Sequence, residues 1–127
     1  MSDAQPPVKD ENGAHPVADA WRPTLREIGR ALMQGDYGLA RGIPCVAPVS
    51  RATAEQMRGY VSDYGETLTE LPDETWNSSV SHWYGSHWEV LVDLWTVESG
   101  RSDMVLDVRV FEAGDSFRFE LHAVYVP

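Results

Sequence analysis

Apolar residues recur at helical spacing in two segments of the first half of the chain. Residues 20–34 place apolar side chains at i, i+4, i+7 and i+11, which predicts an amphipathic helix with one apolar stripe. Residues 54–64 repeat the pattern, and Thr53 and Gln56 have the spacing of a capping box at its start. The intervening residues 35–50 are rich in glycine and proline, so we expect a loop there that contains Cys45.

Alternation of apolar and polar positions replaces helical spacing towards the end of the chain. Residues 88–97, 104–111 and 117–126 each alternate, and turn-forming residues separate them. This pattern predicts an antiparallel meander with one strongly apolar face. We therefore expect an α+β fold, with two N-terminal helices packed on one face of a C-terminal antiparallel β-meander of three to five strands.

The rest of the chain is less regular. Residues 1–19 are polar, rich in proline and without period, which predicts a flexible N-terminal tail before a single α+β domain of residues 20–127. Residues 66–71 fit a short strand. Residues 73–84 fit either a helix or a strand, and we favour the strand, with a hairpin turn at Gly85.

Charge pairing across the last hairpin selects its register. A two-residue loop would set Arg109 opposite Arg118, whereas a four-residue loop, 113–116, sets Arg109 opposite Glu120. Because like charges directly opposed destabilise a sheet, we expect the second register. The predicted polar ladder on the face away from the helices is Asp93–Arg109–Glu120, with Asp107–His122 beside it.

Two interpretations of this polar face remain open. It is either a solvated surface laced with ion pairs, or a site in which Asp107 orients or polarises His122 for acid–base chemistry. A Ser or Cys nucleophile at a recognisable spacing is lacking, so a catalytic triad is not supported. Apolar residues share the face, which predicts partial cover by a loop or a partner: Leu91, Trp95, Val97, Val105 and Val124.

Residues 82–88 concentrate histidine and tryptophan. His82 and His87 bracket the expected turn, and with Glu89 or Asp93 they could ligate a divalent metal, although two histidines five apart match no closed metal pattern. Trp83 could stack on a ligand or serve as an interface anchor. We expect no cofactor and no resident metal.

The charge distribution limits the kinds of partner that the chain is expected to bind. The chain of 127 residues has a formal net charge of −10. Residues 59–100 contain no Lys or Arg but several acids: Asp63, Glu66, Glu70, Asp73, Glu74, Glu89, Asp93 and Glu98. Such a chain repels phosphate backbones, which disfavours nucleic acid and favours a basic protein partner. It has no apolar run long enough to span a membrane and no signal sequence, and one cysteine fits a reducing compartment, so we expect a cytoplasmic protein.

Four segments carry a resemblance: GETLTELP (65–72), HWEVLVDLWT (87–96), GRSDMVLDVRV (100–110) and FELHAVYVP (119–127). They resemble small bacterial proteins grouped as an uncharacterised domain of unknown function, over about residues 20–127. The resemblance implies no activity, ligand or catalytic residue.

Two functions are compatible with these features. The first is a non-enzymatic protein-binding module, immunity-like or regulatory, because no catalytic motif is present. The alternative is a small ligand-binding or enzymatic domain with a pocket near Trp95, Asp93 and His122. Its oligomeric state would be monomer or homodimer. The expected binding residues are Trp83, Trp95, Asp93, Arg109, Glu120 and His122.

Overall fold

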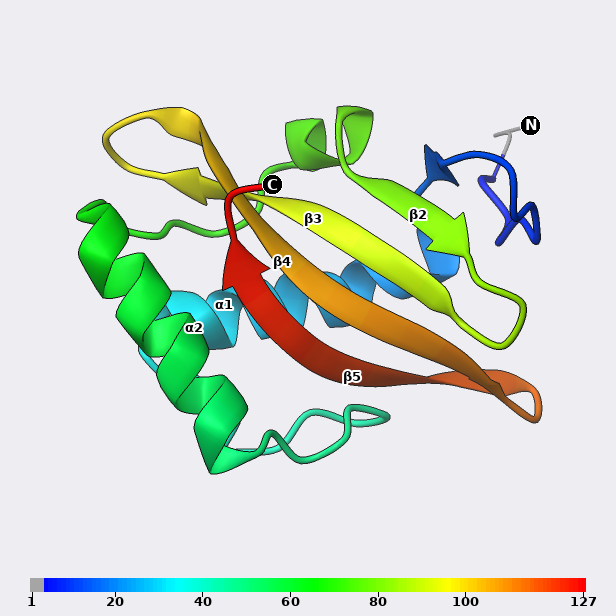
Figure 1. The fold of residues 1–127 in the computed structure, drawn as a ribbon, viewed down its shortest axis with the longest axis horizontal. Helices are drawn as coiled ribbons and strands as arrows, with labels where there is room; N and C mark the ends of the chain where they lie inside the picture. Colours follow the sequence, from blue (N-terminus) through cyan, green and yellow to red (C-terminus); the bar gives the residue numbers. More distant parts are fainter. Residues whose placement is uncertain (1–3) are drawn as a thin grey trace.

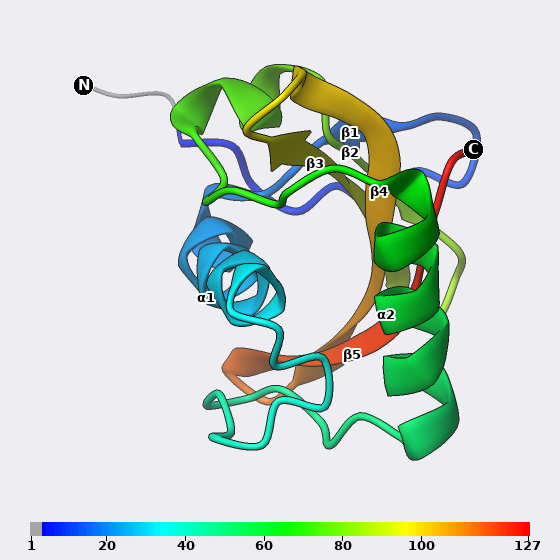
Figure 2. The same cartoon turned by 90° about the vertical axis from the view of Figure 1, so that its left-hand side faces the viewer.

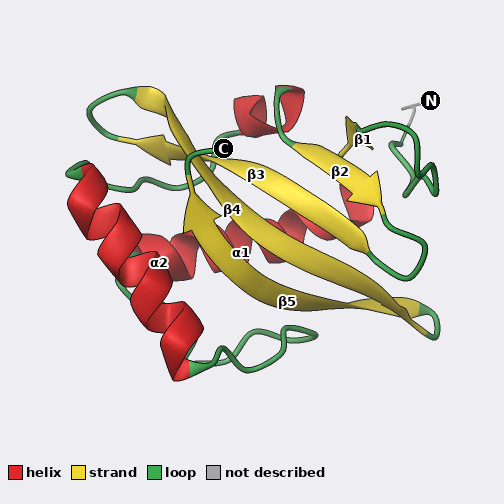
Figure 3. Cartoon of the chain, viewed as in Figure 1, coloured by secondary structure: helices red, strands yellow, loops and turns green. Residues whose placement is uncertain are grey.

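Two α-helices and a five-stranded antiparallel sheet form the fold in the computed structural model, which describes residues 4–127 (Figures 1 and 3). The elements are β1 (His15–Pro16), the 3-10 helix η1 (Asp19–Trp21), α1 (Arg22–Met33), α2 (Arg51–Tyr64), the 3-10 helix η2 (Asp73–Asn77), β2 (Val80–Trp83), β3 (Trp88–Thr96), β4 (Gly100–Ala113) and β5 (Ser116–Tyr125). The strands lie in sequence order across the sheet. The α+β class is confirmed. The expectation that both helices precede the sheet is wrong, because β1 comes before them and pairs with β2.

The two helices occupy different places on the sheet. Helix α1 lies behind the strands in Figure 1 and crosses one face of the sheet (Figures 1 and 2). Its side chains Leu25, Ile28 and Leu32 are buried against that face. Helix α2 lies against the edge strand β5 instead. Its Gln56 side chain donates to the carbonyl oxygen of Val124 at 2.8 Å and accepts from the Val124 N–H at 3.1 Å. This amide satisfies backbone groups that an edge strand would otherwise leave unpaired.

Helix α2 begins earlier than predicted. Ser50 is its N-cap and accepts a hydrogen bond from the Thr53 N–H at 3.1 Å, so the expected capping box at Thr53 is wrong. The helix ends at Gly65, whose φ of 82° is the left-handed conformation that glycine adopts readily.

The core lies between α1 and the sheet and follows the predicted alternation in β3 and β4. Every predicted inward residue of these two strands is buried: Trp88, Val90, Val92, Leu94, Met104, Leu106, Val108 and Val110. At one end Trp88 contacts Trp21, Trp83 and Phe117, with ring centroids 4.6 to 6.1 Å apart. Such edge and tilted ring contacts add specificity to apolar burial.

The register of the β4–β5 hairpin is confirmed at its centre, where Arg109 pairs with Glu120. The strands continue to Ala113 and Ser116, so the loop is shorter than predicted. Between Asp107 and Val108 the register shifts, which leaves His122 as an extra residue in β5. Asp107 therefore pairs with Ala123, so the expected pairing with His122 is wrong. Beyond this bulge Val124 turns into the core and is fully buried, not on the polar face as predicted.

The β3–β4 register also differs from the prediction. Arg109 lies opposite Glu89, and Asp93 lies opposite Val105, so the expected Asp93–Arg109 pair is wrong. The observed register differs from the predicted one by an even number of residues. The same side chains of both strands therefore still face the core.

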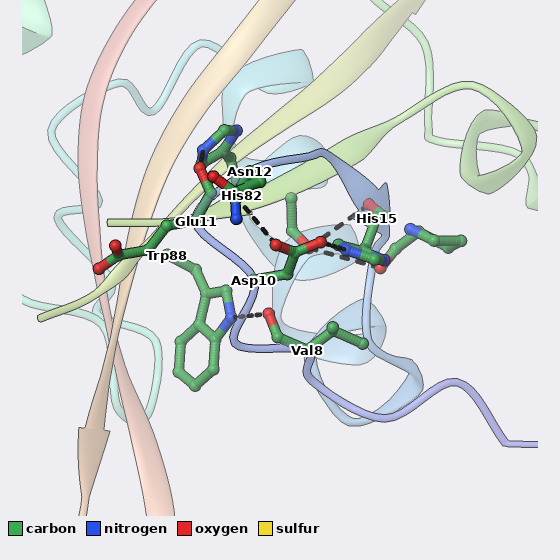
Figure 4. A network of polar contacts seen from close by, with 9 residues as sticks. Val8, Asp10, Glu11, Asn12, His15, His82 and Trp88 are labelled. Carbon is green, nitrogen blue, oxygen red and sulfur yellow. Dashed lines mark hydrogen bonds and ion pairs between the residues drawn. The ribbon is translucent and has the colours of Figure 1, made fainter. Parts of the chain in front are cut away.

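The N-terminal segment packs on the sheet, in contrast to the flexible tail that the sequence predicted. Trp88 Nε1 donates to the Val8 carbonyl oxygen at 3.0 Å (Figure 4). The Lys9 ammonium lies 5.0 Å from the ring of Trp83. The first three residues lie outside the described part of the chain. The ambiguous segment 73–84 contains both alternatives, since the 3-10 helix η2 precedes β2. Residues 66–71 form no strand beyond a bridge from Leu68.

Candidate functional site

The sheet face turned away from α1, which we call the outer face, has no helix across it (Figures 1 and 2). Its side chains come from alternate positions of β2 to β5, on the opposite side from the buried inward set. The residues of its centre are Glu89, Leu91, Val105, Asp107, Arg109, His122 and Tyr125. Because the central strand β4 has neighbours on both sides, side chains on it can be shielded even where no helix covers the sheet.

Asp107 is the most perturbed group on the outer face. Its residue is 3% exposed, and its Oδ1 atom is buried without a hydrogen-bond partner. Burial, followed by the negative charge of the Glu89 carboxylate, raises the pKa of Asp107 to about 6, although Arg109 acts in the opposite direction. Burial, with smaller contributions from Asp107 and Glu89, also raises the pKa of Tyr125. Burial and the neighbouring carboxylates thus oppose the ionisation of Asp107 and Tyr125.

The Arg109 guanidinium forms a hydrogen bond with β5, while its Nε atom is buried without a partner in the described part of the chain. Its Nη2 atom donates to His122 Nε2 at 3.2 Å, which requires that this imidazole nitrogen carry no proton. Glu120, the residue opposite Arg109, pairs instead with Arg118 at 2.9 Å. Among residues 4–127, Glu89 forms no ion pair within 4.0 Å, although it lies directly opposite Arg109.

Aromatic rings form a row beside these charges. The ring of Tyr84 stacks on His82 with centroids 4.6 Å apart and faces His87 at 6.0 Å. His87 in turn lies 5.1 Å from Phe111. A pocket of about 340 Å³ opens here, lined by Tyr84, His87, Glu89 and Arg109. It is a small surface hollow with aromatic and charged walls, and Tyr84 is 53% exposed at its rim.

The two histidines proposed as metal ligands have other partners. His82 Nε2 donates to the carbonyl oxygen of Glu11 at 3.0 Å, and His87 Nδ1 lies 2.9 Å from the Ser86 hydroxyl. Within residues 4–127, no group of three or more His, Cys, Asp or Glu side chains is arranged to hold a metal ion.

Asp93, Trp95 and His122, which the sequence predicts around one pocket, have different neighbours in the structure. Asp93 lines a separate pocket of about 380 Å³, next to Arg101, and its carboxylate accepts a hydrogen bond from the Ser78 hydroxyl. His122 lies instead beside Arg109. Trp95 is half-buried, and its Nε1 atom has no partner in the described part of the chain.

Trp83 lies on the core side of the sheet, away from the outer face. It packs on Trp88 at 4.6 Å, and Lys9, which also forms an ion pair with Glu112 at 2.8 Å, sits over its ring. Figure 4 shows the next residues of the N-terminal segment. Asp10 accepts hydrogen bonds there from the Asn12 N–H and from His15 Nε2, both at 2.9 Å. The hydrogen bond from His15 lowers the pKa of the Asp10 carboxyl, with a further contribution from Asn12. Trp83 is thus a structural residue in this arrangement.

Sequence reasoning identified Asp107, Arg109 and His122 but missed Glu89 and Tyr84 as their neighbours. Glu89 could have been found from the alternation of β3, which places it on the same face as Leu91. Its position beside Asp107 depends on the register, which alternation does not fix.

The fold defines an α+β protein with a meander sheet whose outer face is free of helices. The chain belongs to the family described as Domain of unknown function (DUF7668), whose model matches residues 30–127. The expected resemblance to an uncharacterised family is therefore confirmed. The matched part begins within α1, so it contains the outer face but not β1 or the segment before it. Searches of curated proteins and of solved structures found no match. In the chain from residue 4 onward, neither helix combines the length and apolar content needed to cross a membrane.

Proposed function

We propose that this chain is a non-enzymatic protein-binding module that docks a basic partner on its outer face. The observation that carries the proposal is the Asp107 carboxylate, which is buried, unpartnered at Oδ1 and adjacent to the Glu89 carboxylate. A buried acceptor without a partner costs free energy. A positive charge that a second protein places on the outer face would stabilise the ionised carboxylates of Asp107 and Glu89.

The overall charge supports a basic partner. The net charge is −10. Within residues 4–127, six of the ten Lys and Arg side chains form ion pairs: Lys9, Arg22, Arg26, Arg30, Arg51 and Arg118. Attraction over several ångströms speeds the encounter with a positively charged protein and weakens as salt is added. A second copy of this chain is a poor occupant, because two molecules of the same net negative charge repel each other.

A photo-crosslinking residue at Ala123 tests the proposal. Ala123 lies on β5 directly opposite Asp107, and Ala52 on the exposed side of α2 provides the matched control. We expect one discrete adduct from Ala123 in cells, with a protein of net positive charge, and less of it with Asp107→Asn or at high salt. Equal adduct yield from Ala52, an acidic partner, or no dependence on Asp107 and salt would refute the proposal.

A small ligand is the second candidate, and the pocket lined by Tyr84, His87, Glu89 and Arg109 is the observation that favours it. Thermal unfolding in a panel of metabolite mixtures distinguishes the two candidates. A ligand in this pocket raises the unfolding temperature of the native chain but not of Arg109→Gln, whereas protein docking predicts no such difference.

A further inference from the structure

We propose that the end of the sheet beside Trp83 and Trp88 is a binding site for an extended, lysine-bearing peptide, and that residues 8–11 of this chain occupy it in cis. The site is separate from the outer face, because Trp83 and Trp88 lie on the core side of β2 and β3. A segment of a second protein with the same chemistry would take the place of residues 8–11.

Two indole rings and a carboxylate form a place for one cation at this end of the sheet. Trp83 pairs with Trp88 across β2 and β3. Trp88 in turn pairs with Val110, and Glu112 lies two residues further along β4, so its side chain is on the same face. The Lys9 ammonium lies 5.0 Å from the ring centroid of Trp83 and 6.0 Å from that of Trp88. It also donates to Glu112 Oε1 at 2.8 Å, so the rings and the carboxylate together recognise a lysine side chain.

The other contacts are made to backbone carbonyl groups. Trp88 Nε1 donates to the Val8 carbonyl oxygen at 3.0 Å, and His82 Nε2 donates to that of Glu11 at 3.0 Å (Figure 4). Every residue carries such a carbonyl group, so these two donors accept any sequence that follows the same path across the sheet edge. Trp88 is 1% exposed, and its indole N–H would be an unpaired buried donor without an acceptor from this segment.

The segment that supplies the cis occupant is held at the surface. From residue 4 to residue 16 no residue is buried, and burial begins at Val17. Within this range, pairing with the sheet is limited to the two residues of β1. The side chains of Lys9 and Glu112 are 50% and 53% exposed, and ion pairs at such positions contribute little to stability. Segments with few buried contacts open locally, so a competing peptide can displace residues 8–11 while the domain stays folded.

The site and its occupant also lie in different parts of the family match. The matched residues 30–127 contain His82, Trp83, Trp88 and Glu112, whereas residues 8–11 lie before the match. The side chains that recognise the peptide therefore belong to the matched domain, and the segment that fills the site in cis does not.

Lys9→Glu in the full chain should release residues 8–11, because it sets two carboxylates against each other at Glu112. The reporter is the Trp88 indole N–H, whose NMR shift and hydrogen exchange depend on its bond to the Val8 carbonyl oxygen. We expect a displaced signal and exchange about tenfold faster than in the native chain. Arg41→Glu makes the same charge reversal in the exposed loop after α1 and should leave the signal unchanged.

The probe is a blocked peptide that repeats residues 5–12, acetyl-Gln-Pro-Pro-Val-Lys-Asp-Glu-Asn-amide, added to the Lys9→Glu chain. We expect saturable binding that returns the Trp88 indole signal to its native position. A peptide with norleucine in place of lysine keeps most of the shape without the charge and should bind about fivefold more weakly. The native chain should not bind either peptide at the same concentrations, because its own segment is tethered beside the site.

An unchanged indole signal in Lys9→Glu, or loss of the whole fold, would show that residues 8–11 are a fixed part of the domain and would overturn the proposal. An open Lys9→Glu chain that does not bind the peptide would overturn it too, as would equal affinity for the lysine and norleucine peptides. Crosslinking at Ala123 tests the outer face separately, so the result there does not depend on this site.

Discussion

Replacing Asp107 with asparagine should stabilise the folded chain near neutral pH. The side chain keeps its shape and loses its charge. The pKa of Asp107 is about 6, against an ordinary value of 3.8. One pKa unit corresponds to about 1.4 kcal/mol, so holding this carboxylate ionised in the folded state costs about 3 kcal/mol. That cost disappears in the variant.

The sign follows from proton binding. Between these two pKa values the folded state holds more protons than the unfolded state, so the contribution of Asp107 to stability falls as the pH rises through this window. Above the folded-state pKa the full cost is present, and below the unfolded-state pKa it is absent. The variant should therefore exceed the native chain by about 2–3 kcal/mol above pH 7 and by about zero near pH 3.5.

Urea unfolding followed by tryptophan fluorescence measures both values, and the exposed Asp115→Asn serves as the charge control. For a domain of this size the gain corresponds to an unfolding temperature about 10 °C higher above pH 7. Lower stability of Asp107→Asn above pH 7, or the same difference at both pH values, would show that Asp107 is not a strained carboxylate.

Two further changes test the packing by urea unfolding. Gly29→Ala should destabilise by about 1–3 kcal/mol because its new methyl would lie 2.9 Å from Leu71 Cγ, whereas Gly59→Ala, with nothing within 4 Å, should stabilise α2 by about 1 kcal/mol; a similar effect at both positions would contradict this reasoning. Gln56→Ala should cost about 1–2 kcal/mol and speed amide hydrogen exchange at Val124, since two edge hydrogen bonds are lost, and unchanged exchange would show that water replaces them.

A carboxylate that destabilises the free protein is consistent with a site that meets its counter-charge on binding. Removal of such a group should raise stability and lower affinity together. Asp107→Asn should therefore raise the free energy of unfolding and weaken partner binding. Gly29→Ala, by contrast, should lower stability without changing the outer face.

Much of the fold could be predicted from the sequence because buried positions recur with the period of the helix or strand that contains them. Helical spacing located α1 and α2, and alternation located β3 and β4 together with their inward residues. Charge pairing correctly placed Arg109 opposite Glu120. The N-terminal segment has no such periodicity. Its packing through Val8 and Lys9 depends on contacts with Trp88 and Trp83, which are distant in the sequence.

The candidate site was only partly predictable for a related reason. Alternation decides which face a side chain takes, but several registers preserve it, so the neighbours of Asp107 stayed open. The bulge at His122 adds a residue without disturbing the apolar pattern before it. The neighbouring strands place Glu89 beside Asp107 and leave one carboxylate oxygen without a partner.

The amino-acid sequence by itself determined the two α-helices, the three long strands, the inward faces of β3 and β4 and the excess of negative charge, because these are local or additive properties. The tertiary structure alone decided which charges meet on the outer face and how far water is excluded from them. The pKa of a carboxylate depends on that exclusion and on the charges within a few ångströms, which only the assembled strands fix.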